Sequence, residues 1–387
     1  MHKITQSAIE SLSEMKGETA LSLYLPTHHI ATPATSTEDQ ARYKTLLNKA
    51  MEQWESEAGV DSLKTIRAQL EDIIDDADFW KSTSKGLAFF ATKDTLECFH
   101  MPIECEVYFY VGDSFDVTPL RVACSQDQPF YVLALAKHDP KLFYGDSYDI
   151  QPLDISLPES PEDALNIDEM FSGSNTVRGI STQGGGNDTF STHGQGDTNH
   201  AGQEEHMKYL RIIDHILVAS DKVDKKVPLV LAATESEASD FKHASNYPQL
   251  LNAFVQGNHT GTSTHELHQL VWPVVAQETV LAQQQALIDR FNEDKGRQKA
   301  SSDLAEIHEA AKMGKVDTLI LGIVETTNDS VSDVERVPAP LVRLQNQYVT
   351  SNMCELAQEV IAQGGAIIGA DPELVTTPTG LAALYRY

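Results

Sequence analysis

Apolar positions in the first third of the chain recur with two different periods. Residues 18–27, ETALSLYLPT, place leucines at every second position and stop at Pro26, which predicts a strand followed by a breaker. The next two segments space their apolar residues three or four apart, which predicts amphipathic helices. Three short β-rich runs follow, separated by turn residues. The pattern predicts a β-α-α-β-β-β unit that closes near residue 112, with its later segments at 38–57, 62–80, 86–92, 95–101 and 105–112.

The middle third begins with a hairpin pattern. Apolar runs at 130–136 and 142–144 flank Lys-His-Asp-Pro-Lys, which is a turn by composition. From about 158 to 200 the chain is polar, and such a stretch inside a domain indicates either disorder or a functional loop. A patterned helix is predicted at 201–222. The apolar run VPLVLAAT at 227–234 is typical of a strand covered on both faces.

The last third repeats one arrangement. A long helix is predicted at 278–294, after Trp272 and Pro273, and then two segments each give a helix, a glycine stop and a strand. This alternation predicts the α/β fold class, and a length of 387 residues predicts more than one domain. We expect three domains, at 1–112, 113–262 and 263–387.

The charge of the chain limits its partners. The formal net charge is -28, and residues 113–270 alone hold 10 Lys and Arg against 23 Asp and Glu. Nucleic-acid binding relies on Lys and Arg that neutralise phosphates, so we expect neither autonomous DNA binding nor tight non-specific RNA binding. No run is long and apolar enough to span a membrane, and the N-terminal segment lacks the apolar core of a signal peptide. We therefore expect a cytoplasmic protein with no membrane partner.

Several motifs that could carry chemistry have structural explanations. Cys98 and Cys105 lie in apolar strand-like runs, where burial would raise the thiol pKa, and the four cysteines have no zinc-type spacing. The glycine clusters at 184–186 and 194–196 lack the preceding strand and the following Gly-Lys-Ser/Thr of a nucleotide loop. A GxSxG serine motif is absent. We expect no cofactor.

Histidines near the polar loop raise the question of a metal site. His206 and Asp214 are eight residues apart and could share a helix face, whereas His215 points elsewhere. Because a divalent site needs three or four converging ligands, solvated histidines are the expected outcome, and we expect no metal. A metal-dependent nuclease that uses His193, His200, His206 and His215 is the weakest hypothesis for the function.

Gln195 lies between Gly194 and Gly196 in the polar loop. Its amide can both donate and accept hydrogen bonds, and flanking glycines let a backbone approach a substrate closely. A glutamine is a poor acid or base, so it could only position a water or offer a dipole to a developing charge. The alternative is a flexible acidic linker in which Gln195 has no role.

The order of these segments resembles the class-1 peptide release factors of archaea and eukaryotes and their Pelota relatives. It resembles more closely the bacterial archaeo-eukaryotic release factor families. The likeness covers nearly the whole chain and lies in collinear order rather than in one motif. The segments that carry it are 20–27, 130–146, 191–216, 228–234, 303–322 and 364–387.

The resemblance implies a ribonuclease H-like middle domain, a mixed sheet with flanking helices, and a small ribosomal-protein-like α/β sandwich as the C-terminal domain. It aligns Gly194 and Gln195 with the second Gly and the Gln of the family's Gly-Gly-Gln loop, here at about 172–202, with His193 at the first Gly. In the family, that glutamine helps water attack the ester of peptidyl-tRNA on the ribosome. The implied catalytic group is therefore His193, Gly194, Gln195 and Gly196.

Two main hypotheses for the function follow from the resemblance. The first is a ribosome-rescue or translation quality-control factor that hydrolyses peptidyl-tRNA, with the ribosome, peptidyl-tRNA and a GTPase as partners. The second is a non-catalytic ribosome- or partner-binding protein that kept the fold and lost the chemistry.

Overall fold

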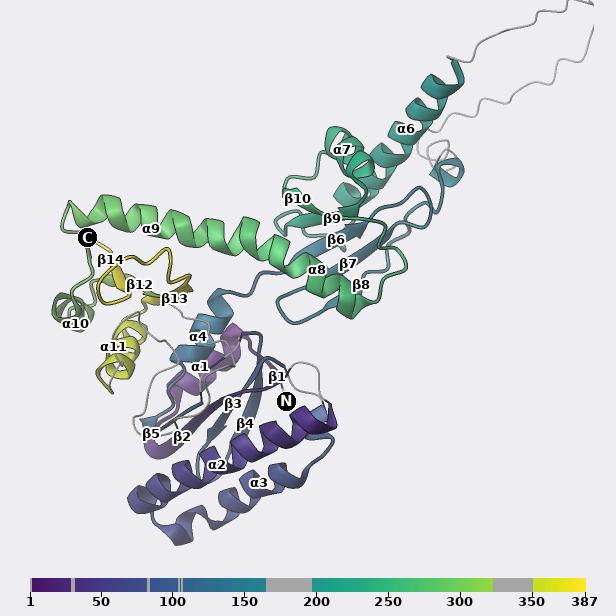
Figure 1. The fold of residues 1–387 in the computed structure, drawn as a ribbon. Helices are drawn as coiled ribbons and strands as arrows, with labels where there is room; N and C mark the ends of the chain where they lie inside the picture. The colour runs from purple at the N-terminus through teal and green to yellow at the C-terminus, as the bar shows by residue number, and fades with distance from the viewer. Residues whose placement is uncertain are drawn as a thin grey trace, which may run out of the picture. The chain divides into compact units, whose positions relative to one another are not determined.

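The protein is α/β and divides into two compact units. The structure is a computed structural model that describes residues 2–28, 32–81, 84–103, 105, 107–164, 197–322 and 351–387 (Figure 1). Unit 1 comprises Met1–Asp127 and Val280–Tyr387, and unit 2 comprises Gln128–Thr279. In the parts of the chain that the structure describes, no helix has the length and apolar character needed to cross a membrane.

The N-terminal sheet of unit 1 has five strands in the order β1-β4-β3-β2-β5. Alternate residues of its strand β2 serve two cores, because Leu23 packs under α2 and α3 whereas Tyr24 packs against α1 and α4. The elements are β1 (His2–Lys3), α1 (Gln6–Glu14), β2 (Lys16–Pro26), α2 (Pro33–Ala58), η1 (Val60–Leu63), α3 (Lys64–Asp75), η2 (Phe79–Lys81), β3 (Gly86–Ala91), β4 (Leu96–Met101), β5 (Tyr108–Ser114) and α4 (Thr118–Ser125).

The predicted β-α-α-β-β-β unit is confirmed as β2-α2-α3-β3-β4-β5. Two elements before it have no counterpart in the prediction. Strand β1 has only two residues, and α1 buries only Ile9 and Leu12. Two buried positions are too few to give a periodic signal along the sequence.

The second sheet of unit 1 has the order β11-β14-β12-β13. Helix α9 covers one of its faces, and α10 and α11 cover the other. Gly314 and Gly364, with φ angles of +67° and +72°, lie just past α10 and α11 in the left-handed region, which confirms the two predicted glycine stops. The elements are α9 (Ala282–Lys295), β11 (Ala300–Ser301), α10 (Leu304–Lys312), β12 (Val316–Gly322), α11 (Ser351–Ala362), β13 (Ala366–Ala370) and β14 (Leu381–Tyr385).

Unit 2 is built on a mixed sheet in the order β10-β9-β6-β7-β8. Strands β6, β9 and β10 are parallel to one another, whereas β7 and β8 continue antiparallel from β6. Every residue of β6 and β9 is buried, because α6 and α7 cover one face and α8 covers the other. The elements are β6 (Phe130–Ala134), β7 (Lys141–Gly145), β8 (Ile150–Pro152), α6 (Asp197–Ala219), β9 (Leu229–Ala233), α7 (Glu235–Ala244), β10 (Leu250–Gln256) and α8 (Thr264–Ala276).

This sheet confirms the α/β fold class and the mixed middle sheet with flanking helices. It also confirms the hairpin at the Lys-His-Asp-Pro-Lys turn, as β6 and β7, and the strand buried on both faces, as β9. The compact units group helices differently from the expected domains, since α4 lies in unit 1 and α8 in unit 2. The division into three domains at 112 and 262 stays a prediction.

Helix α8 has no counterpart in the prediction, which placed a long helix at 278–294, after Trp272 and Pro273. The helix contains Pro273 and then passes into a π-helical turn at Gln277–Leu281. A proline inside a helix removes the hydrogen bond to the carbonyl four residues earlier, here that of Gln269. Both residues lie on the exposed face, where water can bind that carbonyl, while Val271 and Val275 stay packed on the sheet.

The C-terminal half of α6 is docked on the sheet. Its buried residues Tyr209, Leu210, Ile213 and Leu217 join the core over β6 and β9, whereas residues 202–205 are exposed. In Figure 1 the first turns of α6 extend beyond the edge of the sheet. The helix is therefore held at one end and projects at the other.

A buried carboxylate fixes this docking. Asp214 is only 3% exposed, and it accepts hydrogen bonds from the Ser245 hydroxyl at 2.5 Å and the Asn246 backbone N–H at 2.9 Å. Both donors lie just past α7, so the carboxylate ties α6 to the α7–β10 connection. Hydrogen bonds to a charged acceptor are stronger than those between neutral groups.

We expect Asp214→Ala to lower the free energy of unfolding of unit 2 by about 2–4 kcal/mol, because it leaves two donors without an acceptor and opens a small cavity. Urea denaturation followed by circular dichroism measures the change. Asp221→Ala, which removes an exposed carboxylate of the same unit, is the matched control and should change stability by less than about 0.5 kcal/mol. Equal effects of the two variants would contradict the anchoring role of Asp214.

His100 makes the stability of unit 1 depend on pH. Its Nδ1 lies 3.2 Å from the Ser84 hydroxyl, and burial, helped by the charge of Lys3, lowers the pKa of its imidazole below the ordinary 6.5. The folded state therefore binds the imidazole proton more weakly than the unfolded chain does. This contribution to stability is fully present above about pH 6.5 and is lost as the pH falls toward the lowered pKa.

We expect His100→Gln to reduce the loss in the free energy of unfolding of unit 1 between pH 7.5 and pH 5. Chemical denaturation at several pH values measures it, and the exposed His243→Gln variant should keep the slope of the wild type. If both variants follow the wild-type profile, His100 does not carry this pH dependence.

Candidate functional site

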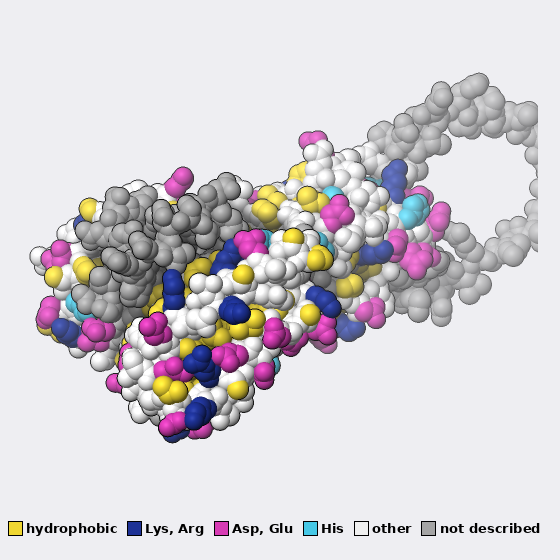
Figure 2. All heavy atoms as spheres, turned by 60° about the horizontal axis from the view of Figure 1, so that its bottom comes forward, with side chains coloured by type: hydrophobic (Ala, Val, Ile, Leu, Met, Phe, Trp, Pro, Cys, Tyr) yellow, Lys and Arg dark blue, Asp and Glu magenta, His cyan; other side chains and the backbone are white. Residues whose placement is uncertain are grey.

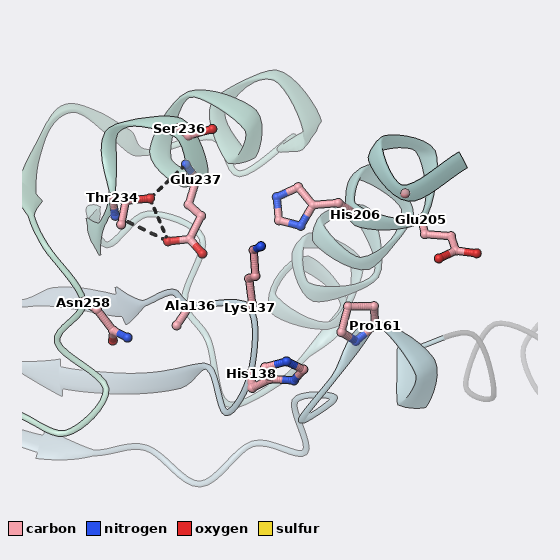
Figure 3. Close-up of a pocket in the computed structure, with 11 residues that line it drawn as sticks. Ala136, Lys137, His138, Pro161, Glu205, His206, Thr234, Ser236, Glu237 and Asn258 are labelled. Atoms are coloured by element: carbon pink, nitrogen blue, oxygen red, sulfur yellow. Dashed lines mark hydrogen bonds between the residues drawn. The ribbon is translucent and has the colours of Figure 1, made fainter. Parts of the chain in front are cut away.

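A cavity of about 670 Å³ opens in unit 2 at the carboxyl ends of β6 and β9. Open α/β sheets commonly bind ligands at this edge, because neighbouring strands lead into separate loops there. The lining comes from the segment after β6, the first turns of α6 and α7, Pro161, and Asn258 after β10 (Figure 3). The cavity is therefore a candidate site formed by five separate segments of one unit.

One wall is the start of α7, which follows β9 directly. Thr234 and Glu237 form a capping box, in which the Thr234 hydroxyl donates to the Glu237 carboxylate at 3.0 Å and accepts from the Glu237 backbone N–H at 3.4 Å. The dashed lines in Figure 3 mark these bonds. The cap holds the Glu237 carboxylate at the cavity wall.

The turn between β6 and β7 supplies Lys137 and His138. Asp139 shapes this turn with a φ of 55°, and its backbone N–H donates to the Glu159 carbonyl at 2.8 Å. Lys137 extends into the cavity between Glu237 and His206 (Figure 3). Among the described residues its ammonium group has no hydrogen bond or ion pair, so it is available to a ligand.

His206 joins the α6 wall to α7. Its Nε2 lies 3.7 Å from the Asp240 carboxylate, one turn beyond Ser236 on α7. The side chain is 21% exposed, so one edge of the ring stays accessible. In Figure 3 Glu205, on the same turn of α6, points away from the other labelled side chains.

Carboxylates make this part of unit 2 electronegative. Burial raises the pKa of the Tyr209 hydroxyl, and the charges of Glu237, Asp139 and Asp163 raise it further. The hydroxyl donates to the Pro158 carbonyl at 3.3 Å. The cavity thus combines Lys137 and two imidazoles with an acidic surround, which suits a polar ligand that carries both donors and acceptors.

The histidines near the polar loop do not form a metal site in the described part of the chain. No three His, Cys, Asp or Glu side chains there come close enough together to hold a metal ion. His206 lines the cavity, whereas Asp214 is engaged by Ser245 and Asn246, and His215 lies on the opposite face of α6. The nuclease hypothesis therefore gains no support from these residues.

His193, Gly194, Gln195 and Gly196, the predicted catalytic group, lie outside the described residues, and α6 begins at Asp197. Their role stays a prediction. Sequence reasoning missed Lys137 and Glu237 as site residues. A signal for Glu237 was present, because Thr-x-x-Glu directly after a buried strand is the signature of a capped helix.

The prediction for the buried cysteine thiols is confirmed at Cys98. This residue packs against the core under α2 and α3, and burial raises the pKa of its thiol to about 12. Burial also raises the pKa of Cys124. Neither thiol forms the thiolate at neutral pH, which excludes them as ready nucleophiles.

Comparison with known proteins shows what the chain is similar to. Residues 129–315 match the family model of Bacterial archaeo-eukaryotic release factor family 3. No curated protein sequence matches the chain. The matched segment contains the whole of β6 to β10 and extends through α10.

Several solved structures are similar over most of their length. An archaeal translation termination factor, aRF1, is 14% identical, with 98% of this chain and 96% of that chain covered and a TM-score of 0.24. Archaeoglobus fulgidus Pelota is 11% identical, with 100% and 94% covered and a TM-score of 0.36. S. cerevisiae Dom34, described as a translation termination-like factor interacting with Hbs1, is 12% identical, with 78% and 74% covered and a TM-score of 0.35. The match confirms, for the middle of the chain, the resemblance to the bacterial archaeo-eukaryotic release factor families that the order of segments predicted.

Proposed function

We propose that this protein is a release-factor-like protein that acts on the ribosome in the cytoplasm, in rescue or translation quality control. The observation that carries the proposal is the family match over residues 129–315, which includes the loop at about 172–202. In this proposal Gln195 orients the water that attacks the ester of peptidyl-tRNA. The ester C–O bond breaks, and the peptide leaves as a carboxylic acid while the tRNA regains its hydroxyl.

The construction of α6 supports this role. The helix is anchored by Asp214 and by the apolar residues of its C-terminal half, and its first turns project from the sheet. In the sequence, Gln195 lies two residues before this projecting part, which begins at Asp197. A glutamine joined to a firmly held helix can reach a substrate outside the protein without disturbing the core that holds it.

A GTPase partner belongs to the same proposal. We infer it from the resemblance to the release-factor and Pelota group. The proposed partners are thus the ribosome, peptidyl-tRNA and a GTPase.

One residue favours a second candidate function. His193 stands where the family's loop has its first glycine, and a side chain there restricts the backbone freedom that a glycine would give. A non-catalytic protein that binds the ribosome or a partner would tolerate this residue. Ribosome binding without peptide release would favour this candidate.

We expect Gln195→Ala to slow peptide release from stalled ribosomes by about 100-fold or more, because removing one group that positions a reactant costs on that order in a preorganised site. Purified ribosomes that carry a labelled peptidyl-tRNA are mixed with the protein, and free peptide is measured over time. Ribosome binding of the variant, measured by sedimentation, should be unchanged.

The matched control is Gln203→Ala, which removes the same side chain from an exposed position on the first turns of α6. It should release peptide at the wild-type rate. Wild-type activity of Gln195→Ala would overturn the proposed mechanism. Binding without release by the wild-type protein would favour the non-catalytic candidate.

A further inference from the structure

The acidic middle unit poses an electrostatic problem for a protein that acts on RNA. The structure describes eight Lys and Arg side chains in unit 2, and four of them are engaged within the unit. Each engaged side chain is a lysine whose ammonium group donates to a nearby carbonyl. These are Lys141 to Thr260, Lys222 to Asp154, Lys225 to Ser220 and Lys242 to Asn252.

The other four have no hydrogen bond or ion pair to another described residue through their side chains. They are Lys137, Lys208, Arg211 and Lys226. Lys137 points into the cavity, and Lys226 lies in the turn after α6. Lys208 and Arg211 are three residues apart on α6, so they share one helix face.

This face of α6 points to solvent. Lys208, Arg211 and His215 are all exposed, and their spacing of three and four residues places them in one row. The buried row of Tyr209, Ile213 and Leu217 lies on the opposite side of the helix. We call Lys208, Arg211 and His215 the outer row of α6.

The outer row is held in a fixed geometry that suits a phosphate backbone. The Asp214 anchor lies between Arg211 and His215 in the sequence, so the backbone beneath the row is firmly docked. The row extends about 10 Å along the helix axis, at about 1.5 Å per residue. A duplex strand carries one phosphate for about every 3.4 Å of axis, so this length can face more than one phosphate. Glu204 and Glu205 lie four and three residues before Lys208, and Asp214, next to His215, is buried.

Basic residues on the helical face of unit 1 are arranged differently. Figure 2 shows Lys and Arg interspersed with Asp and Glu over α2 and α3. Arg42 pairs with Glu38 at 2.8 Å, and Arg67 pairs with Glu55 at 2.6 Å. Charges neutralised by neighbours in this way contribute little to nucleic-acid binding, so α2 and α3 do not present a comparable row.

We propose that the outer row of α6 binds the phosphate backbone of RNA when the protein occupies the ribosome. The inference rests on the proposed function and names the surface that makes contact with RNA. The proposal also explains how a strongly acidic unit can approach RNA. Lys208 and Arg211, which have no acidic partner among the described residues, lie on α6, which begins two residues after Gln195. Each cation that meets a phosphate releases condensed counterions, so the contact should weaken steeply as salt rises.

The test compares two double variants of the full chain that remove equal charge. Lys208→Ala with Arg211→Ala removes the row, whereas Lys222→Ala with Lys226→Ala removes two exposed lysines beyond the end of α6. Ribosome affinity is measured by sedimentation at several salt concentrations. The variant that lacks Lys208 and Arg211, the row variant, should bind ribosomes at least about tenfold more weakly in low salt. The slope of log K against log salt should fall by about 1.4–1.8, because each phosphate contact contributes about 0.7–0.9. The control variant should stay within about twofold of wild type.

Peptide release at saturating protein separates binding from chemistry. The row variant should keep the maximal rate and need more protein to reach half of it, because the row binds RNA and takes no part in the reaction. Circular dichroism establishes that both variants are folded. If the two double variants bind alike, the outer row is an ordinary solvated surface and the inference is overturned.

The two proposals fail in distinguishable ways. Weak binding by the row variant together with full activity of Gln195→Ala would support the RNA-binding row and overturn the hydrolytic mechanism. Loss of activity in Gln195→Ala with unchanged binding by the row variant would do the reverse. A wild-type protein that does not bind ribosomes would overturn both.

Discussion

Burial of β6 and β9 on both faces is the constraint on which unit 2 depends. These strands carry an unbroken series of apolar residues, and alternate side chains enter two cores, one under α6 and α7 and one under α8. Each large apolar side chain buried in this way contributes about 1.5–3 kcal/mol. A strand with no exposed face cannot shift its register without burying polar groups, so the positions of its ends are fixed. The cavity at those ends and the direction of α6 both follow from this register.

Helix α6 combines a docked half with a projecting half. The docked half has an apolar row and one buried carboxylate, Asp214, whose acceptor oxygens are matched by donors past α7. A lone buried charge would be costly, and the matched donors offset that cost. Residues 202–205 of the projecting half are exposed and mostly polar, so they gain little from packing on the sheet. Its sequence is therefore compatible with contact to another particle as well as with water.

Much of the fold could be predicted from apolar periodicity, and the failures have physical causes. The run around Leu231 predicted a doubly covered strand because only such a strand can be apolar at every position. Helix α1 was missed because two buried residues give no period. Helix α8 was not predicted, since Pro273 predicts a break, and only the structure shows that its exposed position makes the lost hydrogen bond tolerable.

The candidate site was less predictable than the fold. Lys137 reads as an ordinary turn residue in sequence, and it enters the cavity only because β6 and β9 lie side by side with their carboxyl ends together. In sequence, His206 was considered only as a possible metal ligand. In the structure it pairs with Asp240 and lines the cavity. Lys137 meets His206 and Glu237 at one cavity although these two residues lie about 70–100 positions further along the chain. The apolar pattern of a short segment does not encode contacts over that distance. The family resemblance came from collinear order, which survives when individual motif residues change.

The place at which α6 is anchored has a consequence for how such proteins can diverge. The residues that hold the helix begin near Tyr209, whereas residues 202–205 are exposed and contribute nothing to the core. Substitutions at residues 202–205 therefore carry almost no penalty in folding, so selection on these positions can act through their task alone. Homologues should vary freely there while keeping the docked half of the helix constant.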